Sequence, residues 1–218
     1  MIRVENVSKS YETRVGHRQI LNDVHFEVGR HEKVGVLGRN GAGKSTLIRL
    51  ISGAEQPTSG LITRDMTVSW PLAFVGAFQA TLTGIDNLKF ICRIYGKDWR
   101  DKVAYVREFT ELGMYLDEPV RSYSSGMAMR LAFAISMVIE FDCFLIDEII
   151  AVGDARFHAK CHKELFEKRA DRALIIVSHD PSYIRLHCER ACVLQGGKLT
   201  SYESVDDAYE VYTRQLAA

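Results

Sequence analysis

The residues from Gly38 to Ser45 have the types and spacing that could bind the phosphates of a nucleotide. They read G-R-N-G-A-G-K-S, which fits the pattern G-x-x-x-x-G-K-[ST] at every fixed position. The glycines let successive backbone N–H groups point into one concavity, where they can hold an anion. Lys44 can reach the β- and γ-phosphate oxygens, and the Ser45 hydroxyl can ligate Mg²⁺. The residues expected to contact the nucleotide from this segment are Gly38, Asn40, Gly41, Ala42, Gly43, Lys44, Ser45 and Thr46.

A pair of carboxylates, Asp147 and Glu148, ends the apolar run of residues 143–146. A carboxylate at the end of a buried strand is well placed to hold Mg²⁺ through its water shell, which suits Asp147. A second carboxylate beside it can orient and deprotonate an attacking water, a role for Glu148. The alternative interpretation is two acids that end a strand in solvent.

The phosphate loop must be positioned by the segments that directly precede and follow it. Residues 33–37 form a short apolar run typical of a buried strand, and residues 45–51 read as a helix. That helix would direct the positive end of its dipole toward the phosphates. Residues 143–146 and 173–177 read as further buried strands. The sequence therefore predicts an α/β chain that binds a nucleoside triphosphate, rather than a glycine-rich turn without a ligand.

The rest of the chain alternates between strand and helix patterns. Residues 2–10 and 23–28 alternate apolar and polar, which predicts half-exposed antiparallel strands. A turn at residues 56–60 is expected to lead into a short strand pair that continues through Trp70. The pattern becomes helical from Gly84 to about Gly113, as expected for a helical insertion.

The last third of the chain contains one helix that differs from the others. Residues 125–139 read as a helix that is apolar on nearly every side, so we expect it to be buried. The chain then continues to a hairpin about Gly196-Gly197 and a polar helix from Ser204 onward.

Composition argues against several classes of function. The chain has 218 residues, with 28 Lys and Arg against 28 Asp and Glu, so its formal net charge is zero. General attraction to nucleic acid would need a basic stripe, and the sequence indicates none. Charged residues interrupt any signal-peptide core at the start, and the longest apolar stretch, residues 131–139, is far shorter than the ~20 residues that a bilayer requires. We therefore expect any membrane role to depend on a partner.

Five cysteines are scattered along the chain without a C-x-x-C pair. Cys188 and Cys192, with His187 beside them, could form a metal cluster. Buried or idle thiols in a reducing cytosol are the favoured interpretation, since a free thiol inside an apolar run behaves as a small hydrophobe.

Together these motifs resemble the ATP-binding cassette (ABC) family over essentially the whole chain. The resemblance implies an α/β fold of the P-loop NTPase type, with a mixed central sheet, an antiparallel β subdomain and an inserted α-helical subdomain. It implies a single ABC ATP-binding domain over residues 1–218, with the helical insertion at about 84–140 and a C-terminal hairpin and helix at about 189–218. It also implies an ATPase that uses ATP and Mg²⁺.

The resemblance assigns roles to four further residues. His179 matches the histidine that touches the γ-phosphate, and Gln79 looks like the glutamine that senses Mg²⁺ and the attacking water. Tyr11 sits where an aromatic ring would stack on adenine, although packing on the core is the rival interpretation. Asp154 fits the loop that crosses the interface between two subunits of the family.

The sequence Y-S-S-G-M occupies the place of the family's signature motif, whose common form is L-S-G-G-Q. Tyr123, Ser125 and Met127 depart from that form. The Ser124 hydroxyl, the Gly126 N–H and the start of a helix remain, and these can face phosphate. In the family this motif contacts ATP held by the other subunit, so the resemblance implies a homodimer with shared sites. A plain helix cap at Ser124 or Ser125 is compatible with that role.

These departures, the run R-L-A-F-A at residues 130–134 and the run I-D-E-I-I-A-V-G-D at residues 146–154 resemble the polysaccharide-exporter branch. That branch includes ATPases for capsular polysaccharide, O-antigen and teichoic acid. Residues 69–72 before Gln79 are closest to the capsular group. The resemblance implies a bacterial subunit on the cytoplasmic face of the inner membrane, which pairs with itself and with a separate integral membrane permease. Because the chain ends at Ala218, we expect it to lack the carbohydrate-binding domain of some O-antigen relatives.

Three alternatives remain open at this point. The exported cargo could be another molecule, such as O-antigen, teichoic acid, a lipid, a drug or a peptide. A soluble ABC ATPase of DNA repair would usually carry a long coiled coil, and no heptad run of that length exists here. A P-loop kinase would need neither the signature motif nor the glutamine loop.

Overall fold

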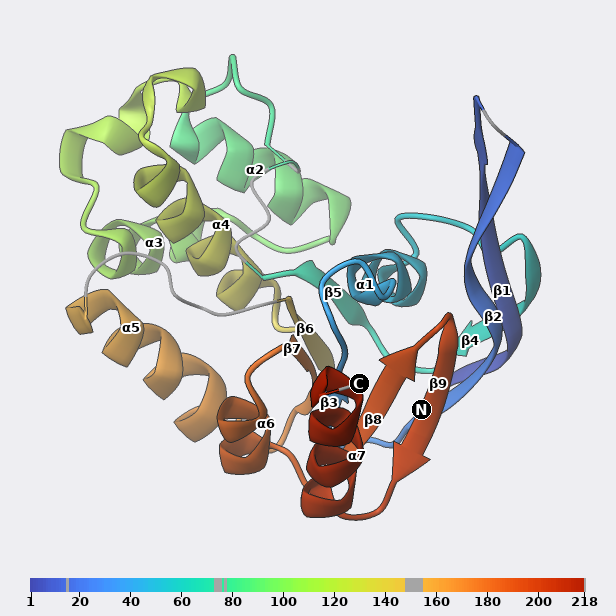
Figure 1. Cartoon of the computed structure of the whole chain (residues 1–218). Coiled ribbons are helices and arrows are strands. Elements are labelled where there is room, and N and C mark those ends of the chain that lie inside the picture. The colour runs from blue at the N-terminus through green and yellow to red at the C-terminus, as the bar shows by residue number, and fades with distance from the viewer. Residues whose placement is uncertain (15, 73–75, 77, 148–154, 218) are drawn as a thin grey trace. The chain divides into compact units, whose positions relative to one another are not determined.

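The computed structural model describes residues 1–14, 16–72, 76, 78–147 and 155–217, with side chains described as far as residue 214. The chain divides into two compact units, and Figure 1 shows their helices and strands, coloured by residue number. The first comprises Met1–Pro71, Asp142–Ile149 and Asp171–Ala218, and the second comprises Leu72–Phe141 and Ile150–Ala170. None of the helices in the described part of the chain combines the length and the apolar character that crossing a membrane demands.

The first unit contains a six-stranded sheet. Its strand order is β5 (Val68–Pro71), β6 (Cys143–Asp147), β7 (Ala173–Ser178), β3 (Lys33–Leu37), β8 (Arg190–Gln195) and β9 (Lys198–Tyr202). All neighbouring pairs are parallel except β8 and β9, which form the expected hairpin. Leu37 lies opposite Ser178, and Asp147 lies opposite Val177. Strands β3, β6 and β7 therefore end side by side, at the sheet edge where ligands of parallel α/β sheets bind.

A second, three-stranded antiparallel sheet belongs to the same unit. Its order is β2 (Gly16–Val28), β1 (Ile2–Thr13) and β4 (Ser59–Arg64). The alternation of apolar and polar residues in β1 and β2 reflects one buried and one exposed face, as the sequence predicts. The pairing of β1 with β2 contains register shifts between Val4 and Ser10.

The expected strand pair through Trp70 is wrong, because β4 and β5 lie in different sheets. Strand β4 pairs with β1, whereas β5 pairs with β6. Asp142, directly before β6, explains the change of sheet: its Oδ2 accepts hydrogen bonds from both the N–H and the hydroxyl of Thr67, each at 2.8 Å. These bonds fix the chain beside β6 where β5 begins. The Ser69 hydroxyl then accepts the Leu145 N–H at 2.9 Å.

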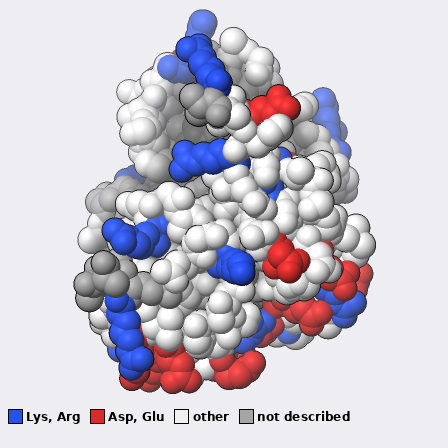
Figure 2. All heavy atoms as spheres, turned by 45° about the vertical axis from the view of Figure 1, so that its right-hand side comes forward, with Lys and Arg blue, Asp and Glu red and all other residues white. Residues whose placement is uncertain are grey.

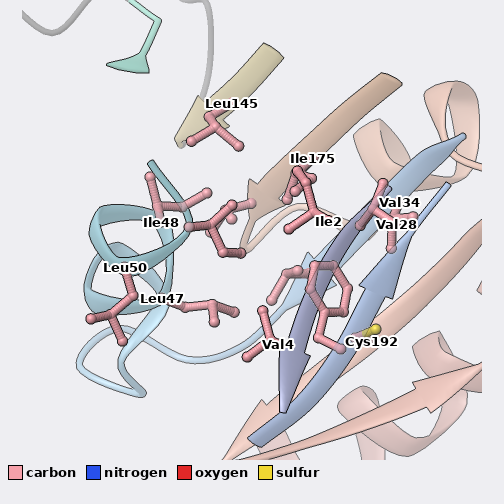
Figure 3. Packing of buried hydrophobic residues seen from close by; sticks show 14 of the residues in the cluster. Ile2, Val4, Val28, Val34, Leu47, Ile48, Leu50, Leu145, Ile175 and Cys192 are labelled. Atoms are coloured by element: carbon pink, nitrogen blue, oxygen red, sulfur yellow. The ribbon is translucent and has the colours of Figure 1, made fainter. Parts of the chain in front are cut away.

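Helix α1 (Lys44–Ser52) packs its apolar side against both sheets of the first unit. Leu47 and Ile48 point toward side chains from the two sheets, as Figure 3 shows, and Leu50 is buried in the same cluster. The core residues labelled there also include Ile2, Val4, Val28, Val34, Leu145, Ile175 and Cys192. Burying each large aliphatic side chain contributes about 1.5–3 kcal/mol. The helix that follows the phosphate loop is therefore anchored by its buried apolar side.

Helix α6 (Pro181–His187) packs closely against β3 at a strand glycine. A Cβ at Gly35 would lie only 2.2 Å from Cγ2 of Ile184, a side chain that is fully buried. The absence of a side chain at position 35 therefore sets how near α6 can lie to the sheet. Helix α7 (Val205–Ala217) closes the chain, as the polar helix expected after Ser204.

The second unit is helical. It contains α2 (Gly84–Ile94), α3 (Val103–Thr110), α4 (Ser125–Ile139) and α5 (Ala155–His162), with a π-helical turn at Lys163–Glu167 and short 3₁₀ turns at Arg100–Lys102, Gly113–Asp117 and Val120–Ser122. Helix α4 has the bounds and the burial that its apolar sequence predicts. Its Phe133 stacks on Phe109 at a ring-centroid distance of 5.6 Å, and Phe157 meets Phe109 edge-on at 5.3 Å. These rings join α3, α4 and α5, so the unit also includes helices beyond the predicted insertion at 84–140.

Candidate functional site

The phosphate loop leads from β3 into α1 through backbone conformations that favour glycine. Gly41 has φ of 82° and Gly43 has φ of 107°, both in the left-handed region. Gly43 is also the N-cap of α1, and no side chain caps that helix end. The first N–H groups of a helix lack partners within the helix, and they attract anions together with the helix dipole. This end of α1 is therefore built to receive a phosphate.

Two glycines of the loop are also required by close packing. A Cβ at Gly38 would lie 2.9 Å from the Leu194 carbonyl oxygen on β8. A Cβ at Gly43 would lie 2.9 Å from Cγ2 of Ile20 on β2. Substitution at either position would push the loop away from the strands that support it.

Lys44 is the charged group of the loop. Its side chain is 6% exposed, and its Nζ donates hydrogen bonds to the carbonyl oxygens of Gly38 at 2.8 Å and Arg39 at 3.1 Å. The backbone of the loop thus holds the ammonium group within the loop's own curve, where the sequence predicts the β- and γ-phosphates.

A cavity of about 350 Å³ lies over the loop and the start of α1. It is lined by Arg18, Ile20, Asn40, Gly41, Gly43, Lys44, Ser45 and Thr46. The donor set fits a polyphosphate, since it combines two cations, an amide and backbone N–H groups. It also fits Mg²⁺, which prefers oxygen ligands such as the Ser45 hydroxyl and keeps several of its own waters. Of the predicted loop contacts, Gly38 and Ala42 lie outside this lining.

Arg18 and Ile20 are cavity residues that the sequence patterns do not indicate. Both lie on β2, and Arg18 is opposite Tyr11 of β1 in the strand register. The pair lies on the hairpin side of the register shifts, in one unbroken register with the Glu12–His17 and Thr13–Gly16 pairs. A signal that could have found Arg18 is its position across the hairpin from Tyr11, which the resemblance places near adenine.

Asp147 and His179 lie at the same sheet edge as the phosphate loop. Asp147 is the last residue of β6 and is half-buried, whereas His179 directly follows β7 and is exposed. The loop around His179 is ordered by its neighbours: the Asp180 N–H donates to Ser178 Oγ at 2.9 Å, and the Asp180 carboxylate accepts the Ser182 N–H at 2.9 Å as the N-cap of α6. Two other predicted site residues, Glu148 and Asp154, lie outside the described residues.

Tyr11 is held by polar groups at the end of β1. Its hydroxyl donates to Glu55 Oε2 at 2.5 Å, and the Lys9 ammonium lies 5.0 Å from the ring centroid. The Tyr11 hydrogen bond is the largest cause that lowers the pKa of the Glu55 carboxyl, with smaller contributions from Arg49 and Lys9. Tyr11 is not among the residues that line the cavity. Its stacking on adenine stays a prediction.

Gln79, Ser124 and Gly126 belong to the second unit. Ser124 caps α4, with the Met127 N–H donating to Ser124 Oγ at 3.2 Å, which is the cap that the sequence allows. Ser124 is exposed and Gly126 is half-buried at this helix end. The Gln79 side chain is exposed, and its backbone is paired with the Asn87 side chain at 2.9 and 3.1 Å. The roles of these three residues stay predictions.

The cysteines near the C-terminus are poor metal ligands. Burial raises the pKa of the Cys188 thiol to about 12, and burial is also the main cause that raises the pKa of Cys192. Burial thus disfavours the thiolate form, which is the form that ligates metals. Within the described ranges, no group of three or more His, Cys, Asp or Glu side chains is arranged to hold a metal ion.

Among the described residues on the face in Figure 2, Lys and Arg side chains lie in separate groups divided mostly by uncharged surface, and most of the Asp and Glu side chains lie along the lower edge. This distribution agrees with the equal numbers of basic and acidic residues in the sequence.

Comparison with known proteins agrees with the geometry. The family model described as "ABC transporter" matches residues 21–151. The capsule polysaccharide export ATP-binding protein CtrD of Neisseria meningitidis serogroup B is 60% identical over 97% of this chain and 98% of its own length. The ATP-binding protein BexA of Haemophilus influenzae is 58% identical, with the same shares covered.

A solved structure shares the fold. The dimeric, post-hydrolysis state of the ATP-binding cassette MJ0796 bound to ADP and Pi has a TM-score of 0.78 at 20% identity, covering 93% of this chain and 98% of that one. The mixed sheet, the antiparallel sheet and the helical unit confirm the predicted α/β cassette fold. The family model matches more than half of the chain, and two relatives are 60% and 58% identical to it over 97% of its length. The chain therefore belongs to the ABC transporter family.

Proposed function

We propose that this chain is the ATP-binding and ATP-hydrolysing subunit of an ABC exporter that moves capsular polysaccharide across a bacterial inner membrane through a separate permease. The observation that carries the proposal is the 60% identity, over 97% of the chain, to a protein named for capsule polysaccharide export. The intact phosphate loop and its cavity support the ATPase activity. Residues 1–218 would act as one ABC ATP-binding domain, with the second unit as its helical part.

The chain's own residues suit the binding of ATP at the cavity over the loop. The N-terminal N–H groups of α1 and the Lys44 ammonium would hold the β- and γ-phosphates, and Tyr11 would stack on adenine. Ser45 and Asp147 would hold Mg²⁺, the latter through water, with Gln79 as a further contact. The ion, when bound, neutralises charge on the β- and γ-phosphate oxygens.

Hydrolysis needs a base and groups that contact the terminal phosphate. Glu148 would orient and deprotonate the attacking water, because it follows Asp147 at the end of β6. His179, one residue beyond β7 at the same sheet edge, would touch the γ-phosphate. Gln79 would contact the water from the helical unit.

The complete site would need two copies of the chain. Ser124 and Gly126 stand at the start of α4, a helix of 15 residues whose dipole favours phosphate. We propose that they face the nucleotide bound by the other subunit, with Asp154 at the interface between the copies. The dimer would dock on its permease at the cytoplasmic face of the inner membrane and would need no nucleic acid.

The test is deletion of the gene in its own bacterium, with complementation by the wild-type chain or by Lys44→Ala. Loss of surface capsule with polymer retained inside the cell, restored by the wild-type chain alone, is the expected result. Normal capsule in the deletion strain would overturn the proposal. Loss of a different surface glycan with capsule intact would keep the ATPase and reject the cargo.

A further inference from the structure

Asn87 makes a set of hydrogen bonds that hold the backbone of Gln79. The Asn87 side chain is fully buried in the first turn of α2. Its Oδ1 accepts the Gln79 N–H at 2.9 Å, and its Nδ2 donates to the Gln79 carbonyl at 3.1 Å. Nδ2 also lies 3.3 Å from the Leu82 carbonyl oxygen and 3.0 Å from that of Thr83. The Asn87 side chain therefore pairs with both the N–H and the carbonyl of the Gln79 backbone, and it closes the loop that follows Gln79.

The pairing fixes both the orientation of the amide and the residue type. Turning the Asn87 amide over would place its NH₂ against the Gln79 N–H and its oxygen against three carbonyls, so only one orientation satisfies the neighbours. Asn is a weak helix former because its side chain competes for backbone hydrogen bonds. Here that tendency serves the loop, which explains a buried amide inside an otherwise apolar helix face.

The same loop is tied to the segment that precedes α4. The Arg121 N–H donates to the Ala80 carbonyl and the Val120 N–H donates to the Leu82 carbonyl, both at 2.9 Å. A β-bridge between Thr83 and Pro119 completes this ladder. Gln79 is thus held on one side by α2, and the next residue, Ala80, is held by the 3₁₀ turn at Val120–Ser122 that leads toward Ser124.

We infer that Asn87 is a positioning residue for Gln79, one that fixes the Gln79 backbone so that its exposed side chain is presented at a constant place. The inference rests on the proposed function, in which Gln79 contacts Mg²⁺ and the attacking water. A buried clamp matters because a displacement of about 1 Å in a catalytic arrangement can cost on the order of 100-fold in rate.

The test compares the steady-state ATPase of the full-length chain in four forms: wild type, Gln79→Ala, Asn87→Ala and the double variant. We expect each single substitution to lower kcat by about 10- to 100-fold and to raise the Mg²⁺ concentration for half-maximal rate, with ATP affinity unchanged. The double variant should be no slower than Gln79→Ala. Once the Gln79 side chain is absent, removing Asn87 displaces no further catalytic group.

Ser136→Ala is the matched control. Ser136 is also fully buried in the second unit, and its hydroxyl donates to the Ala132 carbonyl at 2.9 Å, away from Gln79. It should leave kcat unchanged. If circular dichroism shows that Asn87→Ala is unfolded, Asn87→Asp replaces it. Asp keeps the size of the side chain and the acceptor for the Gln79 N–H but lacks the donors.

The outcomes separate this inference from the proposed function. A wild-type chain without ATPase activity would overturn the proposed function, and the inference with it. An active wild type with Asn87 variants of normal kcat would overturn the inference alone. A Gln79→Ala variant of normal kcat would do so too, as would a double variant whose loss equals the product of the two single losses.

Discussion

The Lys44 ammonium nitrogen lies 2.8 Å from the Gly38 carbonyl oxygen, so the first and the seventh residues of the phosphate loop are joined across its concavity. Because the Lys44 side chain is nearly buried, it loses its conformational entropy when the chain folds and not when a ligand binds. A bound phosphate would meet a cation that is already in place rather than one that must first be ordered.

Replacing Lys44 with Ala should weaken nucleotide binding and ATPase activity together. The substitution removes the charge that faces the β- and γ-phosphates, and hydrogen bonds to charged groups contribute about 1.5–3 kcal/mol, or about 10- to 100-fold in affinity. Isothermal titration calorimetry with ATP measures the change. Lys97→Ala, at an exposed position of the helical unit, is the control. Unchanged affinity in Lys44→Ala would contradict the assignment.

Replacing Glu148 with Gln should preserve ATP affinity and abolish turnover. Gln keeps the size of the side chain but cannot accept the proton of the attacking water. We expect ATP to trap a closed dimer of this variant, visible as a doubling of mass in gel filtration with light scattering. Phosphate release near the wild-type rate would show that another group is the base.

Mixing Ser124→Ala with Lys44→Ala should restore activity that neither variant has alone. In the mixed dimer, one site combines an intact phosphate loop from the first chain with an intact Ser124 from the second. Ser124 also caps α4, and loss of an N-cap costs about 1 kcal/mol, so a melting curve must confirm that the variant is folded. Activity equal to the sum of the separate variants would rule out sites shared between subunits.

Replacing Arg18 with Ala should weaken ATP binding by less than the Lys44 substitution does. Arg18 lines the same cavity but is exposed, so water and salt screen its charge. We expect an effect of about 1 kcal/mol or less at low salt, smaller still at high salt, measured by calorimetry at two ionic strengths. Arg14→Ala, at an exposed position directly after β1, is the control. An effect that salt leaves unchanged would contradict this role.

Replacing Asp142 with Asn should destabilise the fold in a pH-dependent way. The Thr67 N–H and hydroxyl are the main causes that lower the pKa of the Asp142 carboxyl in the folded state. A lowered pKa stabilises the fold above the unfolded value of about 3.9, and this stabilisation is lost as the pH falls through the folded value. For a partly exposed group we expect about 1 kcal/mol at pH 7.

Urea unfolding of wild type and Asp142→Asn at neutral pH and below pH 4 measures this difference. The gap in unfolding free energy should narrow at the lower pH, where the wild-type carboxyl becomes protonated. The exposed Asp171→Asn variant is the control. An equal gap at both values would show that the charge of Asp142 is not what stabilises the β5–β6 edge.

The parts of the site that local sequence encodes could be predicted, and the parts set by long-range pairing could not. The phosphate loop and helix α4 follow from spacing, glycine conformation, the Ser124 cap and an unbroken apolar run. Arg18 reaches the cavity through the pairing of β1 with β2, and Asn87 reaches Gln79 through the closure of a loop. No periodicity in the sequence reports either relationship. The sheet change between β4 and β5 depends on Asp142, more than 70 residues further along the chain.

Gly35 has no side chain, and this absence determines the position of His179, the residue proposed to touch the γ-phosphate. A methyl group there would collide with Ile184, so α6 would have to retreat from β3. The N-cap of α6 is Asp180, which directly follows His179, and a shifted helix would carry that histidine with it. A mutation that adds one carbon atom in the middle of a strand would thus resemble an active-site defect, with ATP still bound and its cleavage slowed.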